Sequence, residues 1–211
     1  PGGPAQLGLG GEFRYEAVND PALNPTNDAQ GLGNARTIGN RTVASAFAEL
    51  GMPVLDNLEV NVSGRYDHYS DFGGNLSPKI GVKYTPIKTV ALRATVSKGF
   101  RAPSFSESGN SASQGFTNFS FANYPDFVAA HGGSEYTKTY SLSNITAANP
   151  DLKPEKSTSY TLGAVWAPTR SFSVSLDYYH IKKNDVIAQA SAGTALAAYY
   201  SGQAIPAGYT V

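Results

Sequence analysis

The fold of this chain is decided between Leu58 and Arg101, where the sequence reads LEVNVSGRYDHYSDFGGNLSPKIGVKYTPIKTVALRATVSKGFR. Three strand-length segments of this stretch alternate apolar with polar side chains. Their apolar positions are Leu58, Val60, Val62 and Tyr66, then Leu76, Ile80, Val82 and Tyr84, then Val90, Leu92, Ala94 and Val96. The charged residues at the intervening positions are Glu59, Arg65, Asp67, Lys79, Lys83 and Arg93. Because alternation of period two sends successive side chains to opposite faces, the stretch predicts a sheet with one apolar and one charged face.

Two architectures produce such a sheet. Each segment has about the length that a tilted strand needs to cross a lipid bilayer, and a membrane β-barrel with a polar interior fits the pattern. A soluble β-sandwich also alternates, but full charges on the second face indicate contact with water rather than a dry interior. We therefore expect an all-β, antiparallel fold that forms part of a transmembrane β-barrel.

The composition and the motifs of the sequence exclude several classes of function. The 211 residues have a formal net charge of zero and no cysteine, so there is no general electrostatic basis for nucleic acid binding and no thiolate metal site. The three histidines, His68, His131 and His180, lie in separate segments without metal-ligand spacing. Neither a GxSxG sequence nor a phosphate-binding loop is present. We expect no enzyme activity, no metal and no cofactor.

Four further strands are expected at about Leu9–Val18, Arg41–Leu50, Ser157–Ala167 and Ser171–Lys183, which makes seven. Short connections that contain proline follow at residues 51–57, 85–89 and 167–170. The opposite ends carry the loop 19–40, the tight turn 71–75, the long segment 102–154 and the tail after Asn184. Short turns at one end and long loops at the other are typical of outer-membrane barrels. The segment 102–154 is expected to be a long extracellular loop without strands.

Aromatic residues near the strand ends suggest an interfacial girdle. They are Tyr66, Tyr69 and Phe72 at one end and Tyr84 and Trp166 at the other. Ordinary cross-strand aromatic pairs would explain each of them singly.

Four motifs resemble the TonB-dependent receptors of Gram-negative outer membranes. They are RYDHYSDFGGNLSPKIGVKYTP (65–86), LRATVSKGFRAPSFSE (92–107), NPDLKPEKSTSYTLG (149–163) and LDYYHIKKNDVI (176–187). They occur in the order of that family. The resemblance implies a barrel of twenty-two strands, an N-terminal plug in its lumen, and uptake of a scarce nutrient with energy delivered by TonB.

The chain departs from the family pattern in size. About seven of the expected twenty-two strands are present, and nothing resembles the plug or the TonB-contacting box. We therefore expect residues 1–211 to be a partial receptor barrel in the outer membrane of a Gram-negative bacterium. The expected partners are outer-membrane lipid, the plug domain of the same receptor, the TonB–ExbB–ExbD complex through the missing N-terminal part, and a small ligand, most commonly an iron–siderophore complex. A passive porin or adhesin barrel and a soluble β-sandwich binding module are the alternatives.

Three groups of candidate residues follow. The resemblance implies that lumen-facing charges contact the plug, and we select Arg65, Asp67, Arg93 and Arg101 for this role. Hydrated wall residues, paired across strands, are the alternative. Aromatic residues and a histidine of the long loop form the second group, either a platform for a flat or apolar ligand or a self-packed loop. They are Phe119, Phe121, Tyr124, His131, Tyr136 and Tyr140, with a helical turn expected over Tyr124–Ala130.

The third group is structural. In GFRAP, Gly99 and Pro103 suit a strand that bends or stops before the long loop, and Arg101 between them extends toward the lumen. In NPDLKPE, the prolines fix an extended return to the sheet, which Glu155 anchors. The residues expected to act in this way here are Asn149, Pro150, Pro154 and Glu155.

Overall fold

The computed structural model describes residues 2–26, 34–131, 139–189 and 191–211. The described residues form two compact units. Unit 1 comprises those within 1–17, 40–104 and 151–187, and unit 2 comprises those within 18–39, 105–150 and 188–211. Within this part of the chain, no helix is long and apolar enough to span a membrane.

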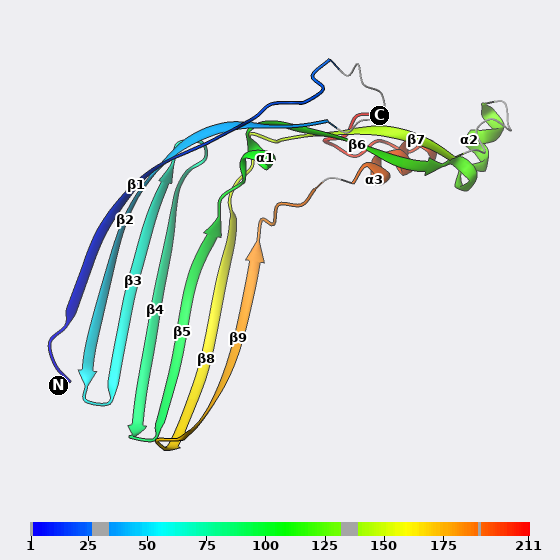
Figure 1. Cartoon of the computed structure of the whole chain (residues 1–211). Coiled ribbons are helices and arrows are strands. Elements are labelled where there is room, and N and C mark those ends of the chain that lie inside the picture. Colours follow the sequence, from blue (N-terminus) through cyan, green and yellow to red (C-terminus); the bar gives the residue numbers. More distant parts are fainter. Residues whose placement is uncertain (1, 27–33, 132–138, 190) are drawn as a thin grey trace. The chain divides into compact units, whose positions relative to one another are not determined.

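Unit 1 is one sheet of seven strands that lie side by side in Figure 1. The strands are β1 (Gln6–Asp20), β2 (Asn34–Leu55), β3 (Leu58–Tyr69), β4 (Gly73–Ile87), β5 (Val90–Arg101), β8 (Glu155–Thr169) and β9 (Phe172–Asn184), of which residues 18–20 of β1 and 34–39 of β2 are counted in unit 2. They are hydrogen-bonded in the order β1-β2-β3-β4-β5-β8-β9, and each pair of neighbours from β2 to β9 is antiparallel. The predicted fold class and the seven expected strands are therefore confirmed.

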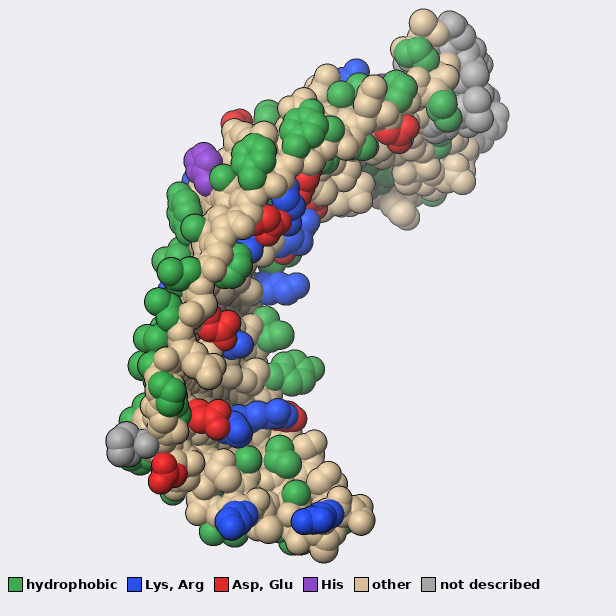
Figure 2. All heavy atoms as spheres, turned by 60° about the vertical axis from the view of Figure 1, so that its left-hand side comes forward, with side chains coloured by type: hydrophobic (Ala, Val, Ile, Leu, Met, Phe, Trp, Pro, Cys, Tyr) green, Lys and Arg blue, Asp and Glu red, His purple; other side chains and the backbone are tan. Residues whose placement is uncertain are grey.

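The two predicted faces are also present. Register places Val82, Ala94 and Leu162 in one row across β4, β5 and β8, and the next position along each strand belongs to the other face. Almost nothing covers the apolar face, since Leu176 is 76% exposed and Val43, at 1%, is one of very few buried apolar residues described in unit 1. Figure 2 shows hydrophobic side chains on one side of the strands and charged ones on the other. The described residues of unit 1 thus contain no second sheet, and the sandwich alternative is wrong.

The short connections are tighter than predicted. Only two residues separate β2 from β3, β4 from β5, and β8 from β9. The strands continue through residues that the sequence assigned to turns, and the ladders shift register between Pro53 and Leu55, between Tyr84 and Ile87, and between Trp166 and Thr169. A proline lies at each shift, since residues 53, 86 and 168 are all proline. Proline has no N–H to donate to the ladder, so a local irregularity beside the turn accommodates it.

Unit 2 contains elements that the alternation did not reveal. Strands β6 (Asn110–Ser120) and β7 (Thr139–Ala147) are antiparallel, and β6 also pairs with residues 34–38 of β2. The helices are α1 (Phe105–Ser108), η1 (Phe121–Asn123), α2 (Pro125–Ala130) and α3 (Ala192–Tyr200). Segment 102–154 is therefore not a loop without strands, which corrects that expectation. The helical turn expected at 124–130 is confirmed as α2.

Candidate functional site

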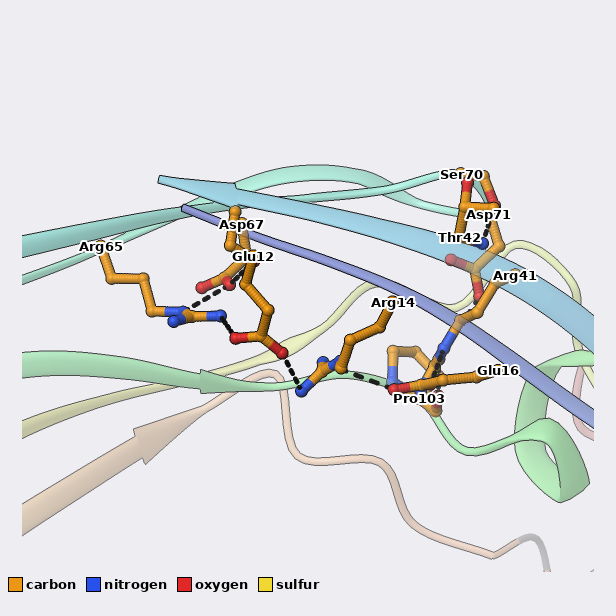
Figure 3. Close-up of polar contacts among 11 residues, drawn as sticks. Glu12, Arg14, Glu16, Arg41, Thr42, Arg65, Asp67, Ser70, Asp71 and Pro103 are labelled. Atoms are coloured by element: carbon orange, nitrogen blue, oxygen red, sulfur yellow. Dashed lines mark hydrogen bonds and ion pairs between the residues drawn. The ribbon is translucent and has the colours of Figure 1, made fainter. Parts of the chain in front are cut away.

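The charged face of unit 1 carries a network that joins three strands (Figure 3). Arg65 of β3 donates from Nε to Asp67 Oδ1 and from Nη2 to Glu12 Oε2 on β1, both at 2.7 Å. Its guanidinium carbon lies 5.6 Å from the ring centroid of Phe47, on the intervening strand β2. A side chain at Gly10 would collide with that ring. The glycine therefore leaves room for Phe47, over which the arginine reaches Glu12.

Arg41 of β2 organises the neighbouring part of this face. It donates to Glu16 Oε2 at 2.7 Å and to the carbonyl oxygen of Pro103 at 2.9 Å. Its guanidinium also lies 5.1 Å from the ring centroid of Tyr69. Tyr69 is buried and stacks on Phe72, so its assignment to an outward aromatic girdle is wrong. The sequence offered no signal for Arg41, because alternation is weak along β2.

A second pair crosses an intervening strand further along the sheet. Arg93 of β5 makes a bidentate contact with Asp177 of β9, with Nη2–Oδ distances of 2.8 and 2.7 Å. Gly163 of β8 lies opposite both residues in the ladder. An added side chain at Gly163 would meet Asp177 Oδ1 and Arg93 Nε, so only glycine leaves the path open.

Glu155 joins the ends of three strands. It is buried, and its Oε1 accepts from Arg101 Nη2 at the end of β5 and from the backbone N–H of Ile187 just after β9, both at 2.9 Å.

The other residues of the structural group lie close to these two in the sequence or in unit 2. Pro103, two residues after Arg101, and Pro154, directly before Glu155, are both buried. Gly99 lies within β5, opposite Ser157. In unit 2, the N–H of Asn149 donates to the carbonyl oxygen of Glu107, and Pro150 lies in a turn.

All four residues selected for plug contact are on the charged face and have partners within this chain. Arg65 pairs with Asp67, Arg93 with Asp177, and Arg101 with Glu155. The alternative of paired wall residues therefore describes their contacts here, and contact with a plug stays a prediction. No cluster of metal-binding side chains occurs among the residues that the structure describes.

The aromatic residues of unit 2 pack on one another around Phe121, which is 5% exposed. Among the described residues, its ring centroid lies within 6 Å of four others, at 5.1, 5.7, 5.5 and 4.7 Å from Phe119, Phe127, Tyr140 and Tyr200 respectively. Tyr124 stacks on Phe119 at 5.7 Å. We call this set, completed by His131, which stacks on Phe127 at 4.0 Å, the aromatic cluster. Tyr136, also selected from the sequence, lies outside the described residues.

Tyr200 was missed because α3 lies far along the sequence, in a segment taken as a tail. Burial raises the pKa of its hydroxyl, so the group stays neutral to a higher pH than a free tyrosine. A depression of about 400 Å³ opens beside it, lined by Tyr124, Phe127, Tyr199 and other residues of α2 and α3. The rings of the aromatic cluster thus pack on one another around Phe121, and some of them also line an accessible depression.

One antiparallel sheet with an apolar face and a face of paired charges defines a wall segment of a membrane β-barrel. A family model described as "TonB dependent receptor-like, beta-barrel" matches residues 1–210, and the chain belongs to this family of receptors, which are not enzymes. The predicted family is therefore confirmed.

Among curated proteins, the chain is 28% identical to the iron-regulated outer membrane virulence protein of Vibrio cholerae over 89% of its length and 24% of that protein. It is 25% identical to the ferric enterobactin receptor of Pseudomonas aeruginosa over 46% of its length and 14% of that protein. The chain thus spans at most about a quarter of these relatives.

Solved structures show the same fold. The siderophore receptor PirA of Acinetobacter baumannii matches with a TM-score of 0.65 and 20% identity, over 87% of this chain and 25% of that one. A mutant of the ferric enterobactin receptor PfeA of Pseudomonas aeruginosa, solved in complex with enterobactin, matches with a TM-score of 0.62 and 20% identity over 85% and 24%.

Proposed function

We propose that this chain forms part of the wall of an outer-membrane transporter that takes up an iron–siderophore complex with energy delivered through TonB. The family match over residues 1–210 carries the proposal. The cargo is inferred from the relatives, which are named for iron regulation, ferric enterobactin or siderophores.

The two faces of unit 1 suit this role. The apolar side chains of the outward face contact lipid, and the charges of the inward face contact water and the plug domain of the same receptor. The two-residue turns lie on the periplasmic side, because short turns face the periplasm in barrels of this type. The segment 102–154 then extends outside the cell, and the TonB–ExbB–ExbD complex acts through the plug.

Three arginines are placed to hold the plug. Arg93, Arg101 and Arg65 keep between a third and just over half of their side chains exposed while they pair with wall carboxylates. A guanidinium has five N–H donors, so the pair with one carboxylate at Arg93, and even the pairs with two carboxylates at Arg65, leave capacity for a further acceptor. The wall carboxylates, Asp67 among them, hold these cations in position, and plug carboxylates bind and release them.

The aromatic cluster supplies the ligand platform. The depression beside Tyr124, Phe127 and Tyr200 is of the size of a small-molecule site and presents ring faces to a flat ligand. Phe119 and Phe121 pack against these rings, Tyr140 packs against Phe121, and His131 stacks on Phe127.

Uptake by whole cells tests the cargo. Cells that lack the complete receptor gene, and cells that regain it, are supplied with radioactive iron bound to a catecholate or a hydroxamate siderophore under iron limitation. We expect uptake of one of these complexes to depend on the receptor gene and on TonB. Equal uptake with and without the receptor, for every siderophore tried, would overturn the proposed cargo.

A pair of variants tests the platform. Tyr200→Ala removes a ring at the rim of the depression, and we expect the KM for uptake to rise about tenfold, since an aromatic contact is worth about 1 kcal/mol or more. Phe116→Ala in β6 is the control, because its ring is exposed and contacts no other described aromatic ring. An unchanged KM for Tyr200→Ala would place the ligand elsewhere.

A further inference from the structure

We propose that the outward face of β5, β8 and β9 binds the headgroup of a membrane lipid that carries more than one phosphate, through Lys98, Lys156 and Lys182. The inference rests on the membrane location in the proposed function. It concerns the opposite face of the wall from the plug-facing charges, and it involves neither cargo nor TonB.

The ladder places the three lysines together. Lys98 lies opposite Thr158, which lies opposite Lys182, so these residues form one row across the three strands. Lys156 is two positions from Thr158 on the central strand, diagonal to both other lysines. Strand spacing then puts their Cβ atoms roughly 7–10 Å apart.

Their face is the apolar one. Arg93 and Asp177 pair on the charged face, and each lysine is an odd number of positions from the corresponding residue of that face on its own strand. The ladder has no register shift between these positions. The row adjacent to Lys98 and Lys182 contains Val96, Tyr160 and His180, and the rows beyond it are apolar as far as Trp166.

The height of the lysines matches the headgroup region. About ten residues of a tilted strand cross the hydrocarbon layer, and roughly this number separates the two-residue turns from Lys98 and Lys182. Tyr160 stands one row closer to the turns, at a level where aromatic side chains sit at the lipid–water interface. The three ammonium groups therefore lie just beyond the hydrocarbon, where lipid phosphates lie.

The charge on this patch is uncompensated and local. The three lysines are exposed, and no carboxylate occupies an outward position of β5, β8 or β9, all of whose residues are described. On β3 and β4 the corresponding outward positions carry residues such as Tyr66, His68 and Leu76, without Lys or Arg. Three cations within about 10 Å require an anion of similar extent, which a headgroup with two phosphates supplies.

The test uses the complete receptor in detergent micelles, with native mass spectrometry as the readout. The probe is diphosphorylated lipid A, compared with its monophosphorylated form and with phosphatidylethanolamine. We expect the wild type to retain diphosphorylated lipid A most strongly. The triple variant Lys98→Gln, Lys156→Gln, Lys182→Gln should lose about 100-fold in affinity, because each basic residue near an anionic headgroup contributes about fivefold.

The matched control removes three positive charges elsewhere on the sheet, through Lys79→Gln on β4, Lys88→Gln in the turn from β4 to β5, and Arg170→Gln in the turn from β8 to β9. We expect it to bind within about twofold of wild type, and the triple lysine-to-arginine variant at the patch to bind as wild type does. Equal loss in the patch and control variants would mean unspecific attraction and would overturn the site, as would retention by the patch variant. Folding of each variant is checked by the heat-dependent gel shift of barrels, and iron uptake is scored separately, so a wrong cargo leaves this result standing.

Discussion

Units 1 and 2 hold their side chains in place by different means. In unit 1, ion pairs such as Arg65–Glu12 and Arg93–Asp177 extend over an intervening strand, and most apolar side chains stay exposed on the other face. In unit 2, rings pack around the buried Phe121. The strands of unit 1 have no interior of their own to cover these apolar side chains and, in the proposed function, lipid covers them, whereas the segment around Phe121 has a small interior.

The largest loss of stability is expected from a substitution in the interior of unit 2. We expect Phe121→Ala to destabilise unit 2 by about 3–4 kcal/mol, because it deletes a buried ring in contact with four others. Hydrogen exchange of the complete receptor should show faster exchange in β6 and β7 with β3–β5 unchanged. Leu176→Ala, on the exposed apolar face, is the control and should cost about 1 kcal/mol or less in the membrane. Equal effects of the two changes would contradict the comparison.

The next largest effect is expected at Glu155, which accepts hydrogen bonds from Arg101 and from the N–H of Ile187. Glu155→Ala leaves the Arg101 guanidinium and the Ile187 N–H without their shared acceptor, and we expect a loss of about 2 kcal/mol. Thermal unfolding of the receptor measures it. Glu155→Gln keeps an acceptor oxygen and should recover part of the loss. If the two variants are equally unstable, the contacts to Glu155 do not carry the effect.

A double-mutant cycle measures how much an ion pair that extends over an intervening strand contributes to stability. We expect Arg93 and Asp177 to be coupled by about 0.5–1 kcal/mol, since both side chains are half exposed. In the Gly163→Ala background the coupling should fall to near zero, because the added methyl group occupies the path between the two charges. Gly64→Ala is the control, as nothing lies within 4 Å of the added atom. Unchanged coupling after Gly163→Ala would show that the Arg93 side chain does not reach Asp177 over Gly163.

The smallest effect is expected for the most exposed pair. Lys83 and Glu59 are more than half exposed and lie at 3.0 Å on neighbouring strands. We expect Lys83→Ala to change the unfolding free energy by no more than about 0.5 kcal/mol. A loss as large as that of Glu155→Ala would mean that exposure does not rank the ion pairs of this face.

The sequence predicted the strands that have one apolar and one polar face, because alternation follows directly from the strand period. It missed β6 and β7, where Ser, Asn and Gly occupy both faces of Asn110–Ser120 and no apolar set stands out. It also missed α3, whose Ala-rich sequence has little contrast between faces. The predicted strands ended too early, at Leu50 and Ala167, because the prolines at 53 and 168 signal a turn unless a register shift accommodates them.

The sequence predicted which face of the sheet carries the charged residues, but it did not predict which residues pair with one another. Alternation placed Arg65, Asp67 and Arg93 on the charged face, but Glu12, the second partner of Arg65, lies two strands away, on β1. Sequence patterns report which residues are neighbours along one strand, and a long side chain that extends over the next strand leaves no such pattern. The contact between Tyr200 and Phe121 likewise depends on how α3 folds back within unit 2.

The passage of Arg93 over Gly163 to Asp177 has a consequence for biogenesis. If β9 were inserted one residue out of step with β8, Asp177 would turn toward the acyl chains and leave the arginine without its acceptor. On a lipid-facing surface, Asp177 would cost less than the about 2–4 kcal/mol of a cation near the bilayer midplane, and the loss of its pair with Arg93 would add to that cost. In the proposed membrane wall, the pair of Arg93 and Asp177 therefore favours the native register of β9 on β8 over a slip by one residue.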